Sequence, residues 1–465
     1  MAAAQDSGWH IILINLAKLL FFIGLAHLPL TLFAYFSGWE VFLSFVATNA
    51  MLLLFGLAFL FKEPGGITHK HAMTISALVW LLIPLASSIP FALYGLPLTD
   101  AYFEAMSGWT TTGFSFIADP AALPAALILY RSYIQWIGGL GVVVFALLIF
   151  KSRFTPALFR TEGTESFQHT VAQTVKNAWV AYAAFTLAGA VLLVMAGIAP
   201  FAALNLAMSA IATGGFIPTA SIAAIPLAAK LTLAAIMLVG ATSLALLHDS
   251  LRLRLHRLLA NNEFQLLTAC AALGTVLVAA NGVLLVDALF HAVSALTGTG
   301  FATADVLSWG APAVLLLMLL MLIGGSSGST SGALRIWRVM VLAKSVYSAV
   351  KGVFLPRFAV VKTKAGAKTL TDQEIIEVSN YFFIYLLFAA LAAFGLMLSG
   401  LDFASAAFTA LSAQGNVGIA PVIGWYELSD GPKLLLAFSM WIGRLQVFPA
   451  LILAAYLLSN RRLSA

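Results

Sequence analysis

The stretch that decides the fold reads Ser107-Gly-Trp-Thr110-Thr111-Thr112-Gly113-Phe114. It recurs three times, as Ser209-Ala-Ile-Ala212-Thr213-Gly214-Gly215-Phe216, Ser294-Ala-Leu-Thr297-Gly298-Thr299-Gly300-Phe301 and Ser412-Ala-Gln-Gly415-Asn416-Val417-Gly418-Ile419. In every copy a serine lies six residues before the last glycine, and an apolar residue follows that glycine. Such self-similarity indicates four copies of one structural unit.

Each copy closes a moderately apolar segment of about ten residues, too short for the roughly 20 that a membrane-spanning helix needs. Irregular backbone after a short helix is tolerated at membrane depth only where it lines a water-filled cavity or is buried in protein. We therefore expect four re-entrant half-helices, at about 101–113, 202–215, 288–300 and 405–418. Acidic residues near their amino ends, Asp100, Glu104 and Asp287, are expected to stabilise the helix dipole rather than attract ions.

Composition places the whole chain in a membrane. Hydrophobic residues make up 62% of its 465 residues and charged residues only 9%, whereas soluble domains carry about 25% charged residues. This excludes a water-soluble enzyme. The long apolar runs predict an all-α polytopic membrane protein with about ten crossings. The runs lie at 11–36, 41–61, 72–94, 125–150, 174–198, 226–248, 264–286, 311–350 with an interruption, 376–399 and 433–458.

The basic residues gather in one alternating set of loops. By the positive-inside rule those loops and both chain termini are cytoplasmic, in a multi-pass protein of the inner or plasma membrane. The net charge of +6 therefore indicates no nucleic-acid partner. The exceptions among the 24 Lys and Arg residues are Lys18, Arg131, Lys230, Lys433 and Arg444, of which only Arg444 is expected deep within a helix. The single cysteine, Cys270, forms no internal disulfide, and we expect no cofactor in this chain.

The repeats have the composition that potassium coordination needs. A potassium ion entering a membrane exchanges its water shell for oxygens, which a ring of backbone carbonyls can supply. Glycine permits the backbone angles that turn carbonyls inward, and the carboxyl end of a short helix favours a cation. A single glycine is often only a helix-packing residue, but four copies in one register favour a selectivity filter. Its expected ion-binding residues are Thr110, Thr111, Thr112, Gly113, Ala212, Thr213, Gly214, Gly215, Thr297, Gly298, Thr299, Gly300, Gly415, Asn416, Val417 and Gly418.

A run of small residues interrupts the second helix of the third repeat. Small flexible residues at membrane depth leave backbone groups unsatisfied, so this loop should line the cavity. A packing face of small residues is the alternative, and a phosphate-binding loop is excluded because the Gly-Lys-Ser/Thr ending is missing. The run consists of Gly324, Gly325, Ser326, Ser327, Gly328, Ser329, Thr330, Ser331 and Gly332.

Arg444 interrupts the last apolar run, within Gly443-Arg444-Leu445-Gln446. A charged residue at that depth is costly, so its default interpretation is functional. Snorkelling towards the cytoplasmic surface is the alternative.

These motifs resemble the filter loops of the Trk/Ktr/HKT superfamily of potassium transporters, over about residues 70–460. Two helices before the first repeat are similar to those of the Trk branch. Within that resemblance, the 324–332 run is similar to an intramembrane gating loop beneath the filter, followed by the basic residues Arg335 and Arg338. Arg444 matches an arginine that helps to set the barrier to cation flow. The family often has Gly-Arg-Leu-Glu, and Gln446 stands here in place of the carboxylate.

The resemblance implies potassium uptake by a homodimer with one pore per subunit, gated by a cytosolic nucleotide-binding regulatory subunit. Membrane lipid is a further expected contact of the basic stretch from Arg335 to Lys368. The domains are assigned as a two-helix extension (1–66), pore repeat 1 (67–173), pore repeat 2 (174–258), pore repeat 3 with a broken second helix (259–370) and pore repeat 4 (371–465).

Two other classes of function compete with a potassium pathway. An ion-coupled secondary transporter of a small solute also uses broken helices, but its repeats are inverted or paired, whereas these four share one orientation. An enzyme is not expected, because no metalloprotease motif or nucleophile elbow occurs. Coupling to protons or sodium, as in a symporter, stays open at this point.

Overall fold

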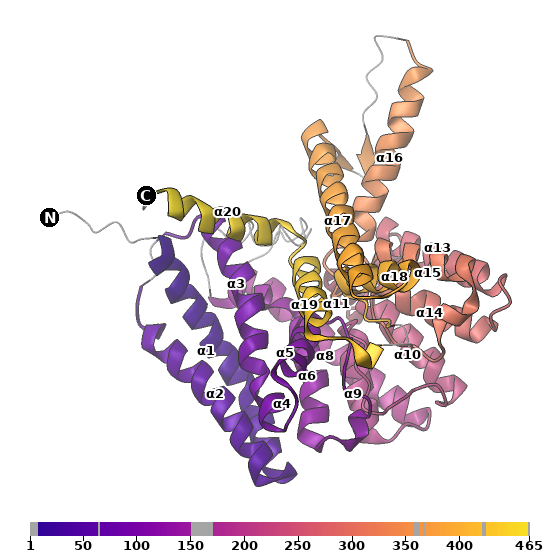
Figure 1. Cartoon of the computed structure of the whole chain (residues 1–465). Coiled ribbons are helices and arrows are strands. Elements are labelled where there is room, and N and C mark those ends of the chain that lie inside the picture. Colours follow the sequence, from indigo (N-terminus) through magenta and orange to yellow (C-terminus); the bar gives the residue numbers. More distant parts are fainter. Residues whose placement is uncertain are drawn as a thin grey trace.

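Long apolar helices form most of the chain (Figure 1) in the computed structural model, which describes residues 8–63, 66–149, 171–356, 363–365, 368–420 and 425–463. Within those residues, six helical segments are long and apolar enough to cross a membrane, and two bent pairs bring the number to eight. The six segments contain α1 (Gly8–Ala34), α2 (Trp39–Leu60), α3 (His69–Ser87) with α4 (Ile89–Leu93), α8 (Val171–Met195), α13 (Asn262–Ala279) and α17 (Asp372–Leu398). The protein is therefore an all-α, multi-pass membrane protein, as predicted.

Four short helices stand between these spans where the sequence predicted half-helices. They are α5 (Leu98–Trp109), α9 (Pro200–Ile211), α14 (Leu285–Thr297) and α18 (Phe403–Gln414). At 1.5 Å per residue each is roughly 18 to 20 Å long, which is less than the hydrocarbon thickness of about 30 Å. Proline marks two of their starts, at Pro97 and Pro200, and the Asp402 side chain caps α18 by accepting from Ser405 N at 3.1 Å.

The second helix is interrupted in all four repeats, and the sequence had indicated a break in the third. In repeat 1, α6 (Ala125–Ile149) has a non-helical Gly141, with φ 78°. In repeat 2, α10 (Leu227–Gly240) and α11 (Leu244–Leu251) meet at 112°, and in repeat 4, α19 (Asp430–Arg444) and α20 (Phe448–Leu463) meet at 107°. In repeat 3, α15 (Ala311–Ile323) and α16 (Ile336–Val353) are separated by residues 324–335. The breaks in repeats 2 and 4 are only three residues long, at 241–243 and 445–447, so the apolar residues on either side of each break read as one run in the sequence.

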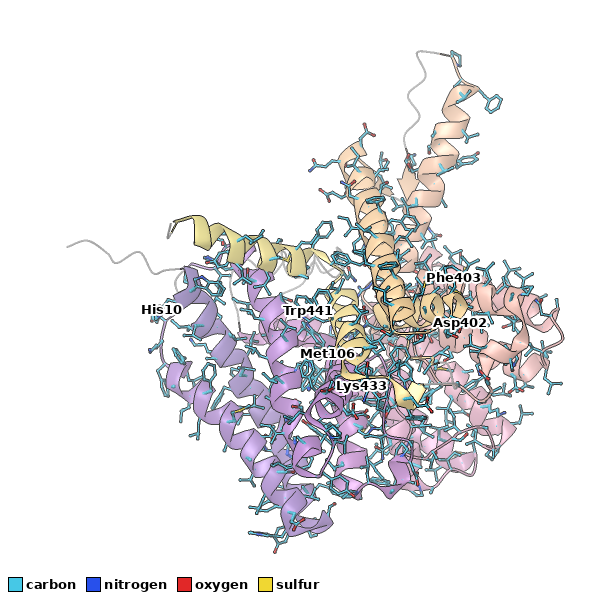
Figure 2. All side chains as sticks on the ribbon, viewed as in Figure 1. His10, Met106, Asp402, Phe403, Lys433 and Trp441 are labelled. Atoms are coloured by element: carbon cyan, nitrogen blue, oxygen red, sulfur yellow. The ribbon has the colours of Figure 1, made fainter. Side chains whose placement is uncertain are left out.

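The four repeats close into a ring in chain order. The second helix of each repeat packs against the short helix of the next: α6 against α9, α10 against α14, and α15 against α18. The ring is completed where α19 of repeat 4 packs against α5 of repeat 1. Figure 2 labels Lys433 and Trp441 on α19 and Met106 on α5, the two helices that meet at this junction. The short helices therefore sit inside a continuous wall of longer ones.

The extension, α1 and α2, packs outside the first repeat, and α1 also contacts α3 and α6. Near the chain ends, Trp9 of α1 meets Tyr456 of α20 with ring centroids 5.0 Å apart, so both ends of the described chain lie on one face. In Figure 1, α16 rises away from the other helices beside α17. The basic residues Lys151, Arg153, Arg160, Arg357 and Lys362, assigned to cytoplasmic loops from the sequence, lie outside the described residues.

The remaining elements are short. They are η1 (Tyr35–Ser37), η2 (Pro120–Ala122), α12 (Leu255–Leu259), η3 (Val306–Trp309), η4 (Trp425–Glu427), and the antiparallel strands β1 (Lys364–Ala365) and β2 (Lys368–Thr369).

Candidate functional site

The segments that follow the four short helices share one backbone conformation. We call them loop 1 (residues 110–113), loop 2 (212–215), loop 3 (297–300) and loop 4 (415–418). In each, the N–H of the third loop residue donates to the carbonyl of the repeated serine, at 2.8 to 2.9 Å. The donor and acceptor pairs are Thr112 and Ser107, Gly214 and Ser209, Thr299 and Ser294, and Val417 and Ser412. The constant spacing from serine to glycine therefore reflects one turn that is built four times.

Two residues in each loop have a positive φ. The last glycines, Gly113, Gly215, Gly300 and Gly418, have φ between 80° and 90°. The second residue of each loop is left-handed as well, at Thr111 (55°), Thr213 (52°), Gly298 (73°) and Asn416 (53°). Residues other than glycine rarely adopt this backbone conformation, and they keep it only where surrounding contacts impose it. These second residues were among the expected ion-binding residues, but their left-handed backbone was not predicted, because in three of the repeats the residue is not glycine.

The loops touch one another around a closed circuit. A Cβ atom built on Gly113 would collide with the carbonyl oxygen of Gly214 in loop 2. The same holds for Gly215 with the Thr299 carbonyl, Gly300 with the Val417 carbonyl, and Gly418 with the Thr112 carbonyl. Each glycine thus leaves room for a carbonyl of the next repeat, and the fourth returns to the first. The geometry brings the predicted residues of all four loops into one ring.

The run of small residues in repeat 3 lies against the other repeats. We call residues 324–335 the cross-loop. Thr330 Oγ1 lies within hydrogen-bond distance of two carbonyl oxygens of repeat 2, Ile211 at 3.0 Å and Gly240 at 2.9 Å. Gly332 lies so close to the Gly415 carbonyl of loop 4 that a Cβ atom would overlap it. The cross-loop is therefore packed against the helix ends of repeat 2 and against loop 4.

Helix breaks provide the polar groups that hold the cross-loop. Because α10 ends at Gly240, the carbonyl of Ala241 is free to accept from Ser326 N at 2.9 Å. After the break, Leu244 N donates to the Gly328 carbonyl at 3.1 Å. The Glu263 carboxylate accepts from Ser327 N at 2.6 Å. The bend in repeat 2 and the loop in repeat 3 thus satisfy each other's backbone groups.

Arg444 connects three repeats. Its guanidinium donates to Thr111 Oγ1 of loop 1 at 3.2 Å and to the Thr330 carbonyl of the cross-loop at 3.0 Å. It also donates to the carbonyls of Gly138 and Gly139, just before the non-helical Gly141 of α6. The Arg444 side chain therefore points to the surrounding repeats, and it does not snorkel to the cytoplasmic surface, which was the alternative interpretation of the sequence.

Gln446 has a partner other than Arg444. Its side-chain oxygen accepts from Arg338 at 2.6 Å, and the Arg338 guanidinium also stacks over the Tyr381 ring, 4.1 Å from the centroid. A neutral amide at this position therefore joins repeat 4 to the start of α16.

A second arginine, Arg131 on α6, is also buried beside the loops, although only Arg444 was expected deep within a helix. Its side chain is 2% exposed and pairs with Glu104 of α5, 1% exposed, at 2.6 Å. It also donates to Ser115 Oγ at 3.2 Å and to the Ile217 carbonyl, just beyond loop 2, at 2.9 Å. Packed protein therefore covers this guanidinium.

Basic residues join two other junctions between repeats. Lys230 of α10 pairs with Asp287 of α14 at 3.3 Å, and Lys433 of α19 pairs with Asp100 of α5. The carboxylates expected to act on the helix dipole therefore also form ion pairs.

Among the described residues, no group of three or more His, Cys, Asp or Glu side chains could hold a metal ion. Oxygen atoms of the loops are the more suitable ligands for an alkali cation.

Four units of helix, half-helix and interrupted helix around one ring of loops define a membrane transport protein of the pore-loop type. The chain belongs to the TrkH family of cation transport proteins, whose family model matches residues 43–286 and 264–464.

Relatives and a solved structure agree with this assignment. An uncharacterized cation transporter of Methanocaldococcus jannaschii is 32% identical over 446 residues, covering 90% of this chain and 89% of that one. The Trk system potassium uptake protein TrkH of Halomonas elongata is 31% identical over 412 residues, covering 83% and 85%. The crystal structure of the potassium transporter TrkH from Vibrio parahaemolyticus matches with a TM-score of 0.84 at 28% identity, covering 95% of this chain and 98% of that chain.

The buried ion pair gives a first prediction. Replacing Arg131 by Met leaves the Glu104 carboxylate buried without its main partner, which costs about 3 to 5 kcal/mol. Thermal unfolding of the purified protein should show a lower midpoint for Arg131→Met, partly restored when Glu104→Gln is added. Lys230→Met, at a more exposed pair, is the matched control and should cost less. Equal losses for both single variants would contradict the assignment of Arg131 as a buried structural cation.

Proposed function

We propose that loops 1 to 4 form the selectivity filter through which this protein takes up potassium across the cell membrane. Potassium uptake is the function of this chain, in agreement with its membership of a cation transport family and with its similarity to Trk potassium uptake proteins. The observation that supports the filter is the closed circuit in which each last glycine adjoins a carbonyl of the next loop. Such a ring can replace the water shell of a cation with backbone oxygens.

The electrostatics of the four short helices favour a cation at this ring. Each helix ends at its loop, so its carboxyl end carries partial negative charge there. The membrane potential adds about 2.3 kcal/mol per 100 mV for one elementary charge moving inward. Potassium is the substrate here, and uptake needs no resident metal or cofactor in this chain.

The cross-loop and Arg444 form the gate in this proposal. Both lie against the loops, and Arg444 donates to loop 1 and to the cross-loop together. A guanidinium beside the pathway repels a permeating cation, and the cross-loop obstructs it physically. Movement of the cross-loop would remove the obstruction and shift the Arg444 hydrogen bonds at the same time.

The proposal also covers the oligomeric state of the protein and its orientation in the membrane. We assign both termini to the cytoplasm, with Trp9 and Tyr456 meeting on that face. The chain acts as a homodimer in the membrane lipid, and a cytosolic nucleotide-binding subunit regulates it. No enzymatic step is needed, because transport is driven by the membrane potential.

A side chain in the ring should weaken selectivity. Gly113→Ser would push against the Gly214 carbonyl and should lower the preference for potassium over sodium in competition uptake assays. Gly310→Ser is the matched control, since Gly310 has a similar φ of 88° but open space around it. The control should keep the wild-type preference. Unchanged selectivity in Gly113→Ser would count against the filter assignment.

Loosening the cross-loop should raise flux. Removing Ser327 and Gly328 shortens the obstruction, and Thr330→Ala removes the side-chain contacts with Ile211 and Gly240. Both variants are expected to take up rubidium faster than wild type in proteoliposomes without a regulatory subunit. Flux at or below the wild-type level in both would show that this loop is not the gate.

A further inference from the structure

One buried amide outside the loops contacts loop 2 directly. Gln135 lies on α6 of repeat 1, one helical turn after Arg131, and its side chain is fully buried. All three of its hydrogen-bond partners belong to repeat 2. Its Oε1 accepts from Ser209 Oγ at 2.8 Å and from Phe216 N at 3.2 Å, and its Nε2 donates to the Gly214 carbonyl at 2.5 Å.

Repeats 3 and 4 make the equivalent connection without a side chain from another repeat. There the repeated serine reaches the residue just after its own loop, since Ser294 Oγ donates to the Phe301 carbonyl at 2.8 Å and Ser412 Oγ to the Ile419 carbonyl at 2.9 Å. In repeat 2 the Gln135 amide lies between Ser209 and Phe216, the residue that follows loop 2. The conformation of loop 2 is therefore held by a residue of repeat 1.

The hydrogen bond from Gln135 Nε2 to the Gly214 carbonyl bears directly on the ring, because this carbonyl adjoins Gly113. Within the part of the chain that the structure describes, the recorded hydrogen bonds include no side-chain donor to the corresponding carbonyls of Thr112, Thr299 and Val417. Loop 2 thus differs from the other three loops at the position where the ring is closed.

We propose that Gln135 is a positioning residue for selectivity, because its amide holds the Gly214 carbonyl and limits the charge that this oxygen offers to a cation. The proposal rests on the assignment of loops 1 to 4 as the filter. Selectivity between alkali cations depends on the number and field strength of the coordinating carbonyls. Sodium costs more to dehydrate than potassium, so an oxygen already engaged by an amide compensates sodium poorly. In the buried, low-dielectric surroundings of Gln135 this hydrogen bond is electrostatically strong.

Without the amide, the Gly214 carbonyl is free to move and to interact more strongly with the smaller ion. Gln135→Met removes the three hydrogen bonds while keeping a side chain of similar length. Gln135→Asn keeps an amide but withdraws it by one methylene group, so it tests the same contact in a variant that retains a polar side chain.

The matched control is Gln414→Met. Gln414 is also a fully buried glutamine, at the end of α18, but its Nε2 donates to the Tyr385 carbonyl at 2.7 Å and not to a ring carbonyl. Its replacement removes one buried amide bond at similar depth. A general loosening of the protein would therefore affect both glutamine variants.

The experiment measures rubidium uptake by the full-length protein in proteoliposomes, with potassium or sodium as competitor, together with the thermal unfolding midpoint of each variant. We expect Gln135→Met to lower the potassium-to-sodium preference about fivefold, the equivalent of one net hydrogen bond. Gln135→Asn should show a smaller loss in the same direction, and Gln414→Met should keep the wild-type preference. If Gln135→Met does not fold, Gln135→Asn decides the question.

Three results would overturn the proposal in distinguishable ways. An unchanged preference in both Gln135 variants, with a lowered one in Gly113→Ser, would reject the role of Gln135 and leave the filter assignment standing. An unchanged preference in Gly113→Ser as well would reject the filter itself. A loss in Gln414→Met as large as that in Gln135→Met would show that general loosening, and not the Gly214 carbonyl, lowers selectivity.

Discussion

The rest of the structure depends on the close approach of four backbone segments at one ring. A carbonyl of each loop lies where the Cβ atom of the glycine in the preceding loop would otherwise be. Any larger residue would push the loops apart, and unsupported backbone at this depth would carry unsatisfied polar groups. The short helices, the interrupted helices behind them and the buried cations all serve to bring these segments together and to hold them there.

Support for the ring comes from polar contacts that cross the boundaries between repeats. Arg131 ties α5 to the segment after loop 2, Lys230 ties α10 to α14, and Lys433 ties α19 to α5. On the other side of the loops, Arg444 and the cross-loop use carbonyls that the helix breaks leave free. The four repeats are alike in their backbone, but different side chains hold each junction. This asymmetry is what allows one repeat, such as the second with Gln135, to be adjusted independently.

The fold and the loops were predictable from the sequence because their signals are local. A serine and a glycine at constant spacing, after a segment too short to span, are visible within a dozen residues. The left-handed Thr111, Thr213 and Asn416 were not predicted, because only tertiary contacts impose such angles on these residues. The breaks in repeats 2 and 4 are only three residues long, so each helix pair read as one apolar run in the sequence. The partners of Gln135 lie 74 to 81 residues further along the chain, so no local pattern indicates them.

Selective entry of potassium through a pathway within this single chain is the central claim. Its most direct test is the uptake of radioactive rubidium into proteoliposomes that contain the purified protein alone, with internal potassium setting the membrane potential. The account predicts uptake that external potassium blocks and external sodium does not. Uptake that sodium blocks as well as potassium, or no uptake even after the cross-loop is loosened, would contradict it.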